Sequence, residues 1–128
     1  MKRILFTGCL LAAAVSPALA DSTFPNTCSE IAFAYAGQNA TIKAVCLKAD
    51  GMPNATSLTL QGISNENGIL TQGSGPSTFQ KSCGNIRVIA NGTGVLLSAQ
   101  CRTTAGNFNP TSLPLNNISN NNGTLQQN

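Results

Sequence analysis

Apolar residues recur at every second position in several short stretches of this chain, a period that predicts β-strands with one buried face. The clearest stretch places Leu97, Ala99 and Cys101 on one side of the chain. The same alternation runs through residues 31–35, 42–46 and 86–89. We therefore predict an all-β protein built of short antiparallel sheets.

Turn-forming residues divide these stretches. The leucines in residues 58–60 and 113–115 predict a third short strand in each half, and Pro114 favours a sheet edge or a strand end there. Asn67-Gly68 and Asn122-Gly123 are pairs that adopt the two positive φ angles of a type I′ hairpin turn. Helical turns are expected at residues 22–28 and 77–83. We therefore predict three strands followed by a hairpin in each half.

The two halves are copies of one sequence. A shift of 55 places residues 22–73 on 77–128 without a gap, and 21 of the 52 pairs are then identical. Two repeats are too few for a solenoid, so we expect them to pack on each other as one pseudo-two-fold domain over 21–128. Residues 74–76 link repeat 1 (22–73) to repeat 2 (77–128), and the linker sequence Gly73-Ser74-Gly75-Pro76 is typical of a hinge.

The first twenty residues have the organisation of a secretory signal peptide. Lys2 and Arg3 precede an apolar stretch that is too short to span a bilayer, and Ala18-Leu19-Ala20 is typical of a cleavage site. We expect cleavage at about Ala20 and a secreted protein, either extracellular or periplasmic.

Cysteine spacing predicts two disulfides. Cys9 leaves with the signal peptide, and the remaining cysteines form two pairs that are each 18 residues apart. An oxidising compartment favours the pairing Cys28–Cys46 and Cys83–Cys101. Zinc is a poor alternative because no Cys-x₂-Cys motif is present. Closing each loop stabilises the fold by roughly 3 kcal/mol in the chain-entropy model.

Composition excludes several classes of function. The chain has no histidine and only four acidic residues, so the usual imidazole base and metal ligand are missing. Without Lys2 and Arg3, five basic residues face four acidic ones, a net charge of +1. That balance provides no basic surface for nucleic acid and no polybasic cluster for a membrane. We therefore expect that the protein is not an enzyme, needs no cofactor and has no metal site.

Motifs at fixed spacing in both repeats resemble the cyanovirin-N homology family of lectins. They are Thr23-Phe24-x-x-Thr27-Cys28, the leucines at 58 and 60 that follow Cys46, and the closing Asn-x-Asn-Gly-x-Leu. The resemblance covers essentially all of 21–128. It implies a cyanovirin-N-like pseudo-two-fold β fold in which each half borrows strands from both repeats, and a monomer or a domain-swapped homodimer. It also implies binding of mannose-rich glycans or glycoproteins at two distant sites.

The resemblance assigns residues to both sites. The first site would use Thr23, Asn26, Thr27, Ala49, Asn120 and Asn122. The second would use Ser64, Asn65, Asn67, Thr78, Lys81, Ser82, Arg102, Thr103 and Thr104. Amide and hydroxyl groups of this kind suit sugar hydroxyls, which both donate and accept hydrogen bonds. The absence of tryptophan argues against sites built on ring stacking.

Departures from the family pattern favour the second site. Leu47 stands where an acidic residue is usual and Ala49 where threonine is common, whereas Arg102 and Thr103 match. Ser64 and Thr104 depart from the pattern at the second site. The expected function is therefore non-catalytic mannose recognition, and the alternative is a secreted binding module for a protein or a non-mannose polysaccharide.

Some of these polar residues also have structural interpretations. Asn67 and Asn122 are also ordinary hairpin-turn residues, and the Ser and Thr residues before Cys28 and Cys83 are also typical helix caps. N-glycosylation sequons begin at Asn39, Asn54, Asn91, Asn117 and Asn122, and they matter only where the host glycosylates secreted proteins.

Overall fold

The computed structural model describes residues 21–91 and 94–128, and the predicted signal peptide at 1–20 lies outside them. Repeat 1 forms η1 (Phe24–Asn26), β2 (Cys28–Ala36), β3 (Asn39–Leu47), β4 (Pro53–Thr59), β5 (Gln61–Glu66) and β6 (Ile69–Pro76). Repeat 2 forms η2 (Phe79–Lys81), β7 (Cys83–Asn91), β8 (Gly94–Arg102), β9 (Phe108–Pro114), β10 (Ile118–Asn121) and β11 (Thr124–Gln127). The predicted all-β class and the two helical turns, which are 3₁₀ turns, are confirmed.

Each repeat makes one three-stranded antiparallel sheet and one hairpin. The sheets have the orders β2-β3-β4 and β7-β8-β9, and the hairpins are β5-β6 and β10-β11. Register places Cys28 opposite Cys46 and Cys83 opposite Cys101. The predicted disulfides join these pairs. The Asn-Gly turns have the expected positive φ, 51° and 89° in both hairpins.

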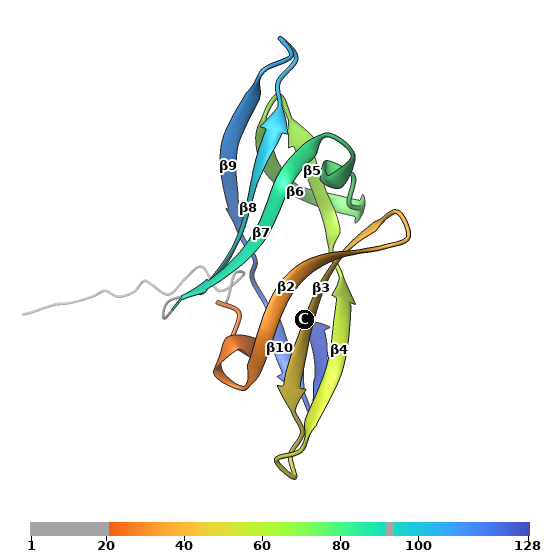
Figure 1. Cartoon of the computed structure of the whole chain (residues 1–128), viewed down its shortest axis with the longest axis vertical. Helices are drawn as coiled ribbons and strands as arrows, with labels where there is room; N and C mark the ends of the chain where they lie inside the picture. Colours follow the sequence, from red (N-terminus) through yellow and green to blue (C-terminus); the bar gives the residue numbers. More distant parts are fainter. Residues whose placement is uncertain (1–20, 92–93) are drawn as a thin grey trace, which may run out of the picture.

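The hairpins are exchanged between the repeats. The β10-β11 hairpin of repeat 2 packs on β4 of repeat 1, and the β5-β6 hairpin of repeat 1 packs on β9 of repeat 2. Figure 1 shows the resulting elongated molecule, with a three-stranded sheet and the other repeat's hairpin in each half. The interleaved halves implied by the family resemblance are confirmed.

Strand β6 carries the chain from one repeat to the next. Gly73–Pro76, the expected linker segment, forms the end of this strand rather than a separate loop. Gly62 on β5 lies against Gly73 at the irregularity in this hairpin, and a Cβ at residue 62 would clash with the Gly73 carbonyl. Glycine is therefore required at that position.

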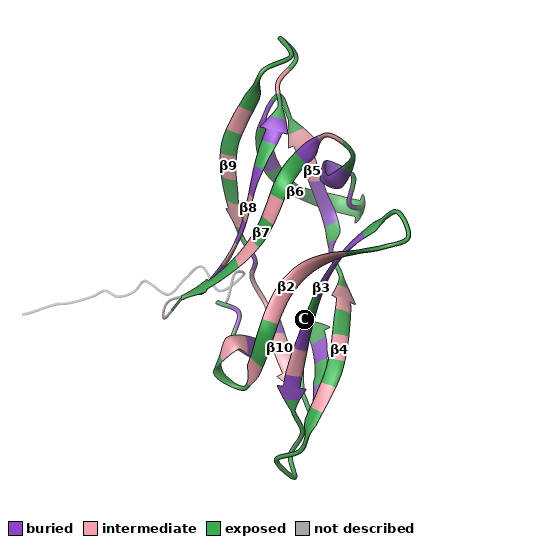
Figure 2. Cartoon of the chain, in the orientation of Figure 1, coloured by how far each residue is buried: buried purple, intermediate pink, exposed green. Residues whose placement is uncertain are grey.

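One hydrophobic core runs through both halves (Figure 2). The predicted inward faces are confirmed, with Ile42 and Leu97 fully buried beside the alanines and cysteines of the same strands. Tyr35 departs from the expected buried face, since 58% of it is exposed. The reason is that β2 is a sheet edge, where Tyr35 packs only edge-on against Phe33, with ring centroids 5.1 Å apart.

Buried serines attach each hairpin to the start of a 3₁₀ turn. The Ser22 hydroxyl donates to the Leu115 carbonyl and accepts from the backbone N–H of Ile118 at 3.1 Å. Ser77 accepts the N–H of Ile63 in the same way at 3.0 Å. These bonds join segments that are far apart in sequence. No helix in the described part of the chain has the length and apolarity needed to cross a membrane.

Candidate functional site

The predicted site residues gather mainly at the two ends of the molecule. The first end is where the β3-β4 turn meets the β10-β11 turn, and the second end is where the β8-β9 turn meets the β5-β6 turn. These ends lie at opposite extremes of the long axis (Figure 1). Each end therefore combines residues from both repeats.

Asn120 holds the first end together. Its Nδ2 donates to Thr27 Oγ1 and to the Leu47 carbonyl, each at 2.9 Å, and its Oδ1 accepts the N–H of Gly123 at 2.7 Å. Both amide hydrogens are therefore used within the protein. Asn120 joins the 3₁₀ turn, the end of β3 and the hairpin turn, so it positions the site and has no donor left for a ligand.

Asn65 does the same at the second end. Its Nδ2 donates to Ser82 Oγ and to the Arg102 carbonyl, each at 2.9 Å, and its Oδ1 accepts the N–H of Gly68 at 2.7 Å. The two asparagines are 55 residues apart, the repeat shift. The duplication has therefore preserved a hydrogen-bonded frame at both ends.

The turn asparagines contact the opposing turn through their carbonyl oxygens. Asn122 Oδ1 accepts the Ala49 N–H at 2.8 Å. Asn67 Oδ1 accepts both the N–H and the hydroxyl of Thr104, at 2.9 and 3.1 Å. Both asparagines are exposed, and neither Nδ2 has a partner among the described residues. Each end therefore presents an amide donor at its rim.

Two further pairs dock the hairpins, and they were missing from the predicted sites. Asn54 and Asn109 donate through Nδ2 to the carbonyls of Gly123 and Gly68, at 2.8 and 2.9 Å. Thr56 and Thr111 accept backbone N–H groups of the docked hairpins at 3.1 Å. Both pairs are identical between the repeats at the 55-residue shift. This identity is the sequence signal by which they could have been predicted.

A hollow of about 510 Å³ opens at the first end. It is lined by Thr27, Leu47, Lys48, Ala49, Gly51, Asn120, Asn121 and Asn122. Four of the six predicted first-site residues are thus brought together, and Lys48 is the one charged side chain in the lining. Half of the lining residues carry a neutral hydroxyl or amide side chain, and much of the remaining wall is apolar.

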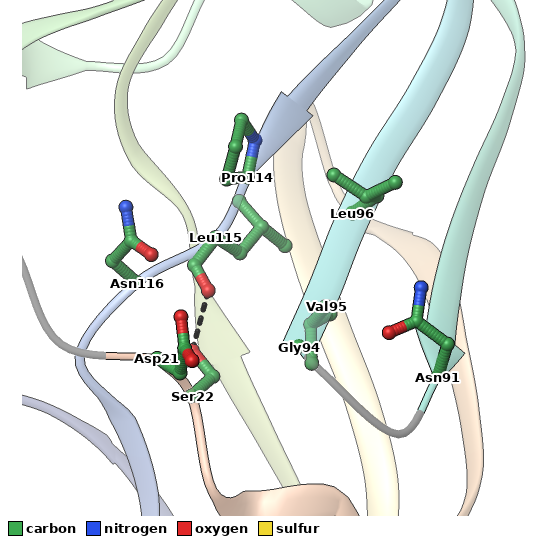
Figure 3. Close-up of a pocket in the computed structure, with 9 residues that line it drawn as sticks. All are labelled: Asp21, Ser22, Asn91, Gly94, Val95, Leu96, Pro114, Leu115 and Asn116. Carbon is green, nitrogen blue, oxygen red and sulfur yellow. Dashed lines mark hydrogen bonds between the residues drawn. The ribbon is translucent and has the colours of Figure 1, made fainter.

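Thr23 and Asn26 lie elsewhere. They line a separate depression of about 170 Å³ that also includes Asp21, Asn91 and Gly94. That depression shares residues with a hollow of about 250 Å³ between residues 21–22 and the β8 and β9 strands, drawn in Figure 3. Figure 3 shows the bond from Ser22 to the Leu115 carbonyl within it. Thr23 and Asn26 thus share one depression, and Thr27, the residue after the 3₁₀ turn, lines the hollow at the first end.

The second-end residues surround the Asn65 network. Asn65 is bonded to Ser82 and Arg102, and Asn67 is bonded separately to Thr104. Ser64 lies on β5, Thr78 immediately precedes η2, and Lys81 is the last residue of η2. The Thr103 hydroxyl accepts the Asn107 N–H at 3.2 Å and closes the β8-β9 turn.

The Arg102 guanidinium adds a feature to the second end that sequence reasoning missed. Its carbon lies 5.2 Å from the centroid of the Phe108 ring, and the two residues pair across β8 and β9. The ring is 54% exposed. An exposed cation and an aromatic ring therefore stand together beside the second site.

Metal binding has no support in the described residues, 21–91 and 94–128. No group of three or more His, Cys, Asp and Glu side chains is arranged there to hold an ion.

Comparisons with known proteins agree with the fold. A model of the CVNH domain matches residues 24–126. The chain is similar to microvirin, solved as a complex with mannobiose, at 30% identity, with 84% of this chain and 99% of that chain covered and a TM-score of 0.63. It is similar to TbCVNH from T. borchii at 29% identity, with 83% and 99% covered and a TM-score of 0.64.

A designed cyanovirin-N homologue lectin is also similar, at 25% identity over 83% of this chain and 99% of that chain, with a TM-score of 0.63. No curated protein matches the sequence.

Proposed function

Since the chain belongs to the CVNH family of carbohydrate-binding lectins, we propose that this lectin is secreted, acts without catalysis and recognises mannose-rich oligosaccharides. The family resemblance predicted from the repeated motifs is confirmed. The finer proposal rests on the chemistry of the two ends and on a relative.

The observation that carries the proposal is the pair of neutral, preorganised hydrogen-bonding frames. A pyranose presents neighbouring hydroxyls that donate and accept, and it is best held by amides, hydroxyls and backbone groups on a rigid support. Asn65 and Asn120 supply the support by fixing the turns. Asn67 and Asn122 keep Nδ2 donors at the rim, so a ligand gains bonds without reorganising the protein.

Mannose is supported by a relative. Microvirin, 30% identical over 84% of this chain, is solved with mannobiose. The retention of the frame asparagines in both repeats favours two sites on one molecule. Sites at opposite ends of the long axis would allow one molecule to cross-link two glycans, which raises apparent affinity for a multivalent surface.

We infer that the second end binds more strongly. It has Arg102, Thr103 and Thr104 where the first end has Leu47, Lys48 and Ala49. The hydroxyls and guanidinium of the second end provide more hydrogen-bonding groups. A sugar ring is therefore expected to make more bonds there.

Secretion is supported by the composition of residues 1–20 and by the disulfides. A disulfide in each half is what an oxidising compartment produces. Processing at about Ala20 would begin the mature chain at Asp21. Mass spectrometry of the secreted protein tests this, and a mature chain that retains residues 1–20 would contradict it.

A glycan array followed by calorimetry tests the ligand. We expect signals for high-mannose structures and for mannobiose, and weak signals for xylan, β-glucan and chitin oligomers. The absence of any high-mannose signal at high protein concentration would overturn the mannose proposal. A signal confined to another polysaccharide would identify the alternative binding module.

Matched variants test the order of the two sites. Replacing Arg102 and Thr103 by alanine should remove most of the mannobiose affinity, whereas alanine at the equivalent Leu47 and Lys48 should leave it nearly unchanged. Denaturation curves of both variants control for folding. Equal losses from the two variants would contradict a dominant second site.

A further inference from the structure

The five sequons are distributed unequally between the two ends. Asn54 and Asn122 lie at the first end, and Asn122 lines its hollow. The equivalent positions at the second end are not acceptors. Asn109 is followed by Pro110, which blocks glycosylation, and Asn67-Gly68 is followed by Ile69 where Asn122-Gly123 is followed by Thr124.

Geometry separates the two first-end sequons. Asn54 is half-buried, and its Nδ2 donates to the Gly123 carbonyl under the hairpin. A sugar on that nitrogen would occupy the space in which the hairpin docks. Asn122 is exposed, its Oδ1 is fixed by the Ala49 N–H, and its Nδ2 has no partner among the described residues. Of the two first-end sequon asparagines, only Asn122 presents an unpartnered amide nitrogen at the hollow.

We propose that Asn122 is an N-glycosylation site whose glycan covers the first hollow, so that the glycosylated lectin binds through its second end alone. The proposal rests on the proposed secretion, through a pathway that glycosylates. Because Asn122 forms part of the wall, the first sugar of the attached chain stands at the mouth of the hollow.

The chemistry uses a donor that the host supplies. A polyprenyl-pyrophosphate-linked oligosaccharide is transferred by a host oligosaccharyltransferase. Asn122 Nδ2 forms a bond to the anomeric carbon of the donor, the bond from that carbon to phosphate oxygen breaks, the amide loses one proton and the polyprenyl pyrophosphate leaves. The hydroxyl of Thr124 completes the acceptor sequence.

Glycosylation of only one end would change the number of binding sites on the molecule. An unmodified chain has two ends for cross-linking glycans, while a chain modified at Asn122 has one. Loss of bivalence is expected to lower apparent affinity for a dense mannose surface on the order of 10²-fold while leaving the affinity of the second end unchanged. Glycosylation would therefore convert a cross-linking lectin into a monovalent one.

The test begins with glycopeptide mapping of the full chain secreted from a glycosylating eukaryotic host. We expect a glycan on Asn122 and none on Asn54. An unmodified Asn122 overturns the proposal, and so does a folded product that carries a glycan on Asn54. This measurement is independent of mannose binding, so it stands even if the proposed ligand is wrong.

Matched variants test the masking. Thr124→Ile removes the acceptor sequence by giving repeat 2 the residue that repeat 1 has at the equivalent position, Ile69, and it leaves Asn122 in place. From the same host, calorimetry with mannobiose should give one site per chain for the parent protein and two for Thr124→Ile. Equal stoichiometry in the two secreted proteins overturns the masking.

A transfer variant and an unglycosylated control complete the test. Adding Ile69→Thr to Thr124→Ile places an acceptor sequence at Asn67, and the surviving mannobiose affinity should then be that of the first end. Retained second-end affinity with Asn67 occupied would overturn the masking mechanism. Parent and Thr124→Ile proteins made without glycosylation should bind alike, and a difference between them would assign the effect to the substitution itself.

Discussion

The two ends share a frame and differ at their rims. Asn65 and Asn120 make the same three hydrogen bonds, and each bond of Asn65 has the same length as the corresponding bond of Asn120. The residues around them differ in charge and size, since Arg102 replaces Leu47 and Thr104 replaces Ala49 in the second copy. After the duplication, the asparagines that hold the turns have therefore been retained, while the exposed residues around them have changed.

The two turns share their backbone hydrogen bonds and differ in the side chain that adds one more. In the β3-β4 turn, Asp50 Oδ1 accepts the Met52 N–H at 2.9 Å. In the β8-β9 turn, the Thr103 hydroxyl accepts the Asn107 N–H at 3.2 Å. The backbone has the same shape in both turns, because the bonds from Lys48 N–H to the Met52 carbonyl and from Gly51 N–H to the Lys48 carbonyl recur between the equivalent residues 103, 106 and 107. The comparison teaches that backbone geometry is conserved at these ends while side-chain chemistry is free to change.

The largest effect is expected from removing the frame. Asn120→Ala and Asn65→Ala each delete three hydrogen bonds, and at about 1 kcal/mol per bond each should lower the free energy of unfolding by about 3 kcal/mol. Urea denaturation measures both. Asn121→Ala is the control, because it loses a single exposed bond to Gln126. A much smaller loss at one end would show that its frame is not equivalent to the other.

A smaller effect is expected at the hairpin glycines. Both have φ of +89°, and a Cβ on Gly68 would lie 2.8 Å from Thr103 Cγ2, whereas on Gly123 it would lie 2.8 Å from Lys48 Cγ. The lysine chain is able to move and the β-branched threonine is not. Gly68→Ala should therefore destabilise by about 2 kcal/mol and Gly123→Ala by less. Thermal unfolding compares them, and the reverse order would contradict this explanation.

Exchanging the turn residue should transfer one hydrogen bond between the ends. The Thr104 hydroxyl donates to Asn67 Oδ1, and Ala49 lacks that donor. Thr104→Ala should cost about 1 kcal/mol, and Ala49→Thr should contribute a similar amount. Denaturation of both single variants and of the double exchange measures this. Additive effects that nearly cancel are expected because the ends are far apart.

The smallest effect concerns the bulge in each outer strand. Glu30 and the equivalent Asn85 both have left-handed backbones, with φ of 53° and 52°. Asparagine tolerates this region better than glutamate, so Glu30→Asn should stabilise by roughly 0.5 kcal/mol, a part of the 1–2 kcal/mol cost of the left-handed conformation. Asn85→Glu is the reverse variant and should destabilise to a similar extent. A change in stability of the same sign in both variants would contradict the explanation from the left-handed backbone.

Much of the fold was predictable from the residues alone. The alternation of Leu97, Ala99 and Cys101 predicts a half-buried strand because successive side chains point to opposite faces. Matched cysteine spacing predicts both disulfides, and Asn-Gly predicts both hairpin turns. These features depend on neighbours in sequence or on a symmetry that the sequence itself repeats.

The candidate sites were predictable only in part. The sequence does not show that both amide hydrogens of Asn120 are bonded to Thr27 and Leu47, because this depends on which groups face Asn120 in space. Thr23 and Asn26 fall in another depression, because the 3₁₀ turn lies between them and the first hollow is reached only by Thr27 beyond it. Partner choice of this kind is not encoded in the order of residues.

The sequence by itself determined the strands, the turns, the disulfides and the duplication, because each follows from local conformation or internal repetition. Only the tertiary structure decided which hairpin docks on which sheet. That exchange brings residues such as Ala49 and Asn122, 73 positions apart, into contact. The physical reason is that each hairpin buries its leucine and satisfies its turn on the other repeat's sheet, so both ends are assembled from distant parts of the chain.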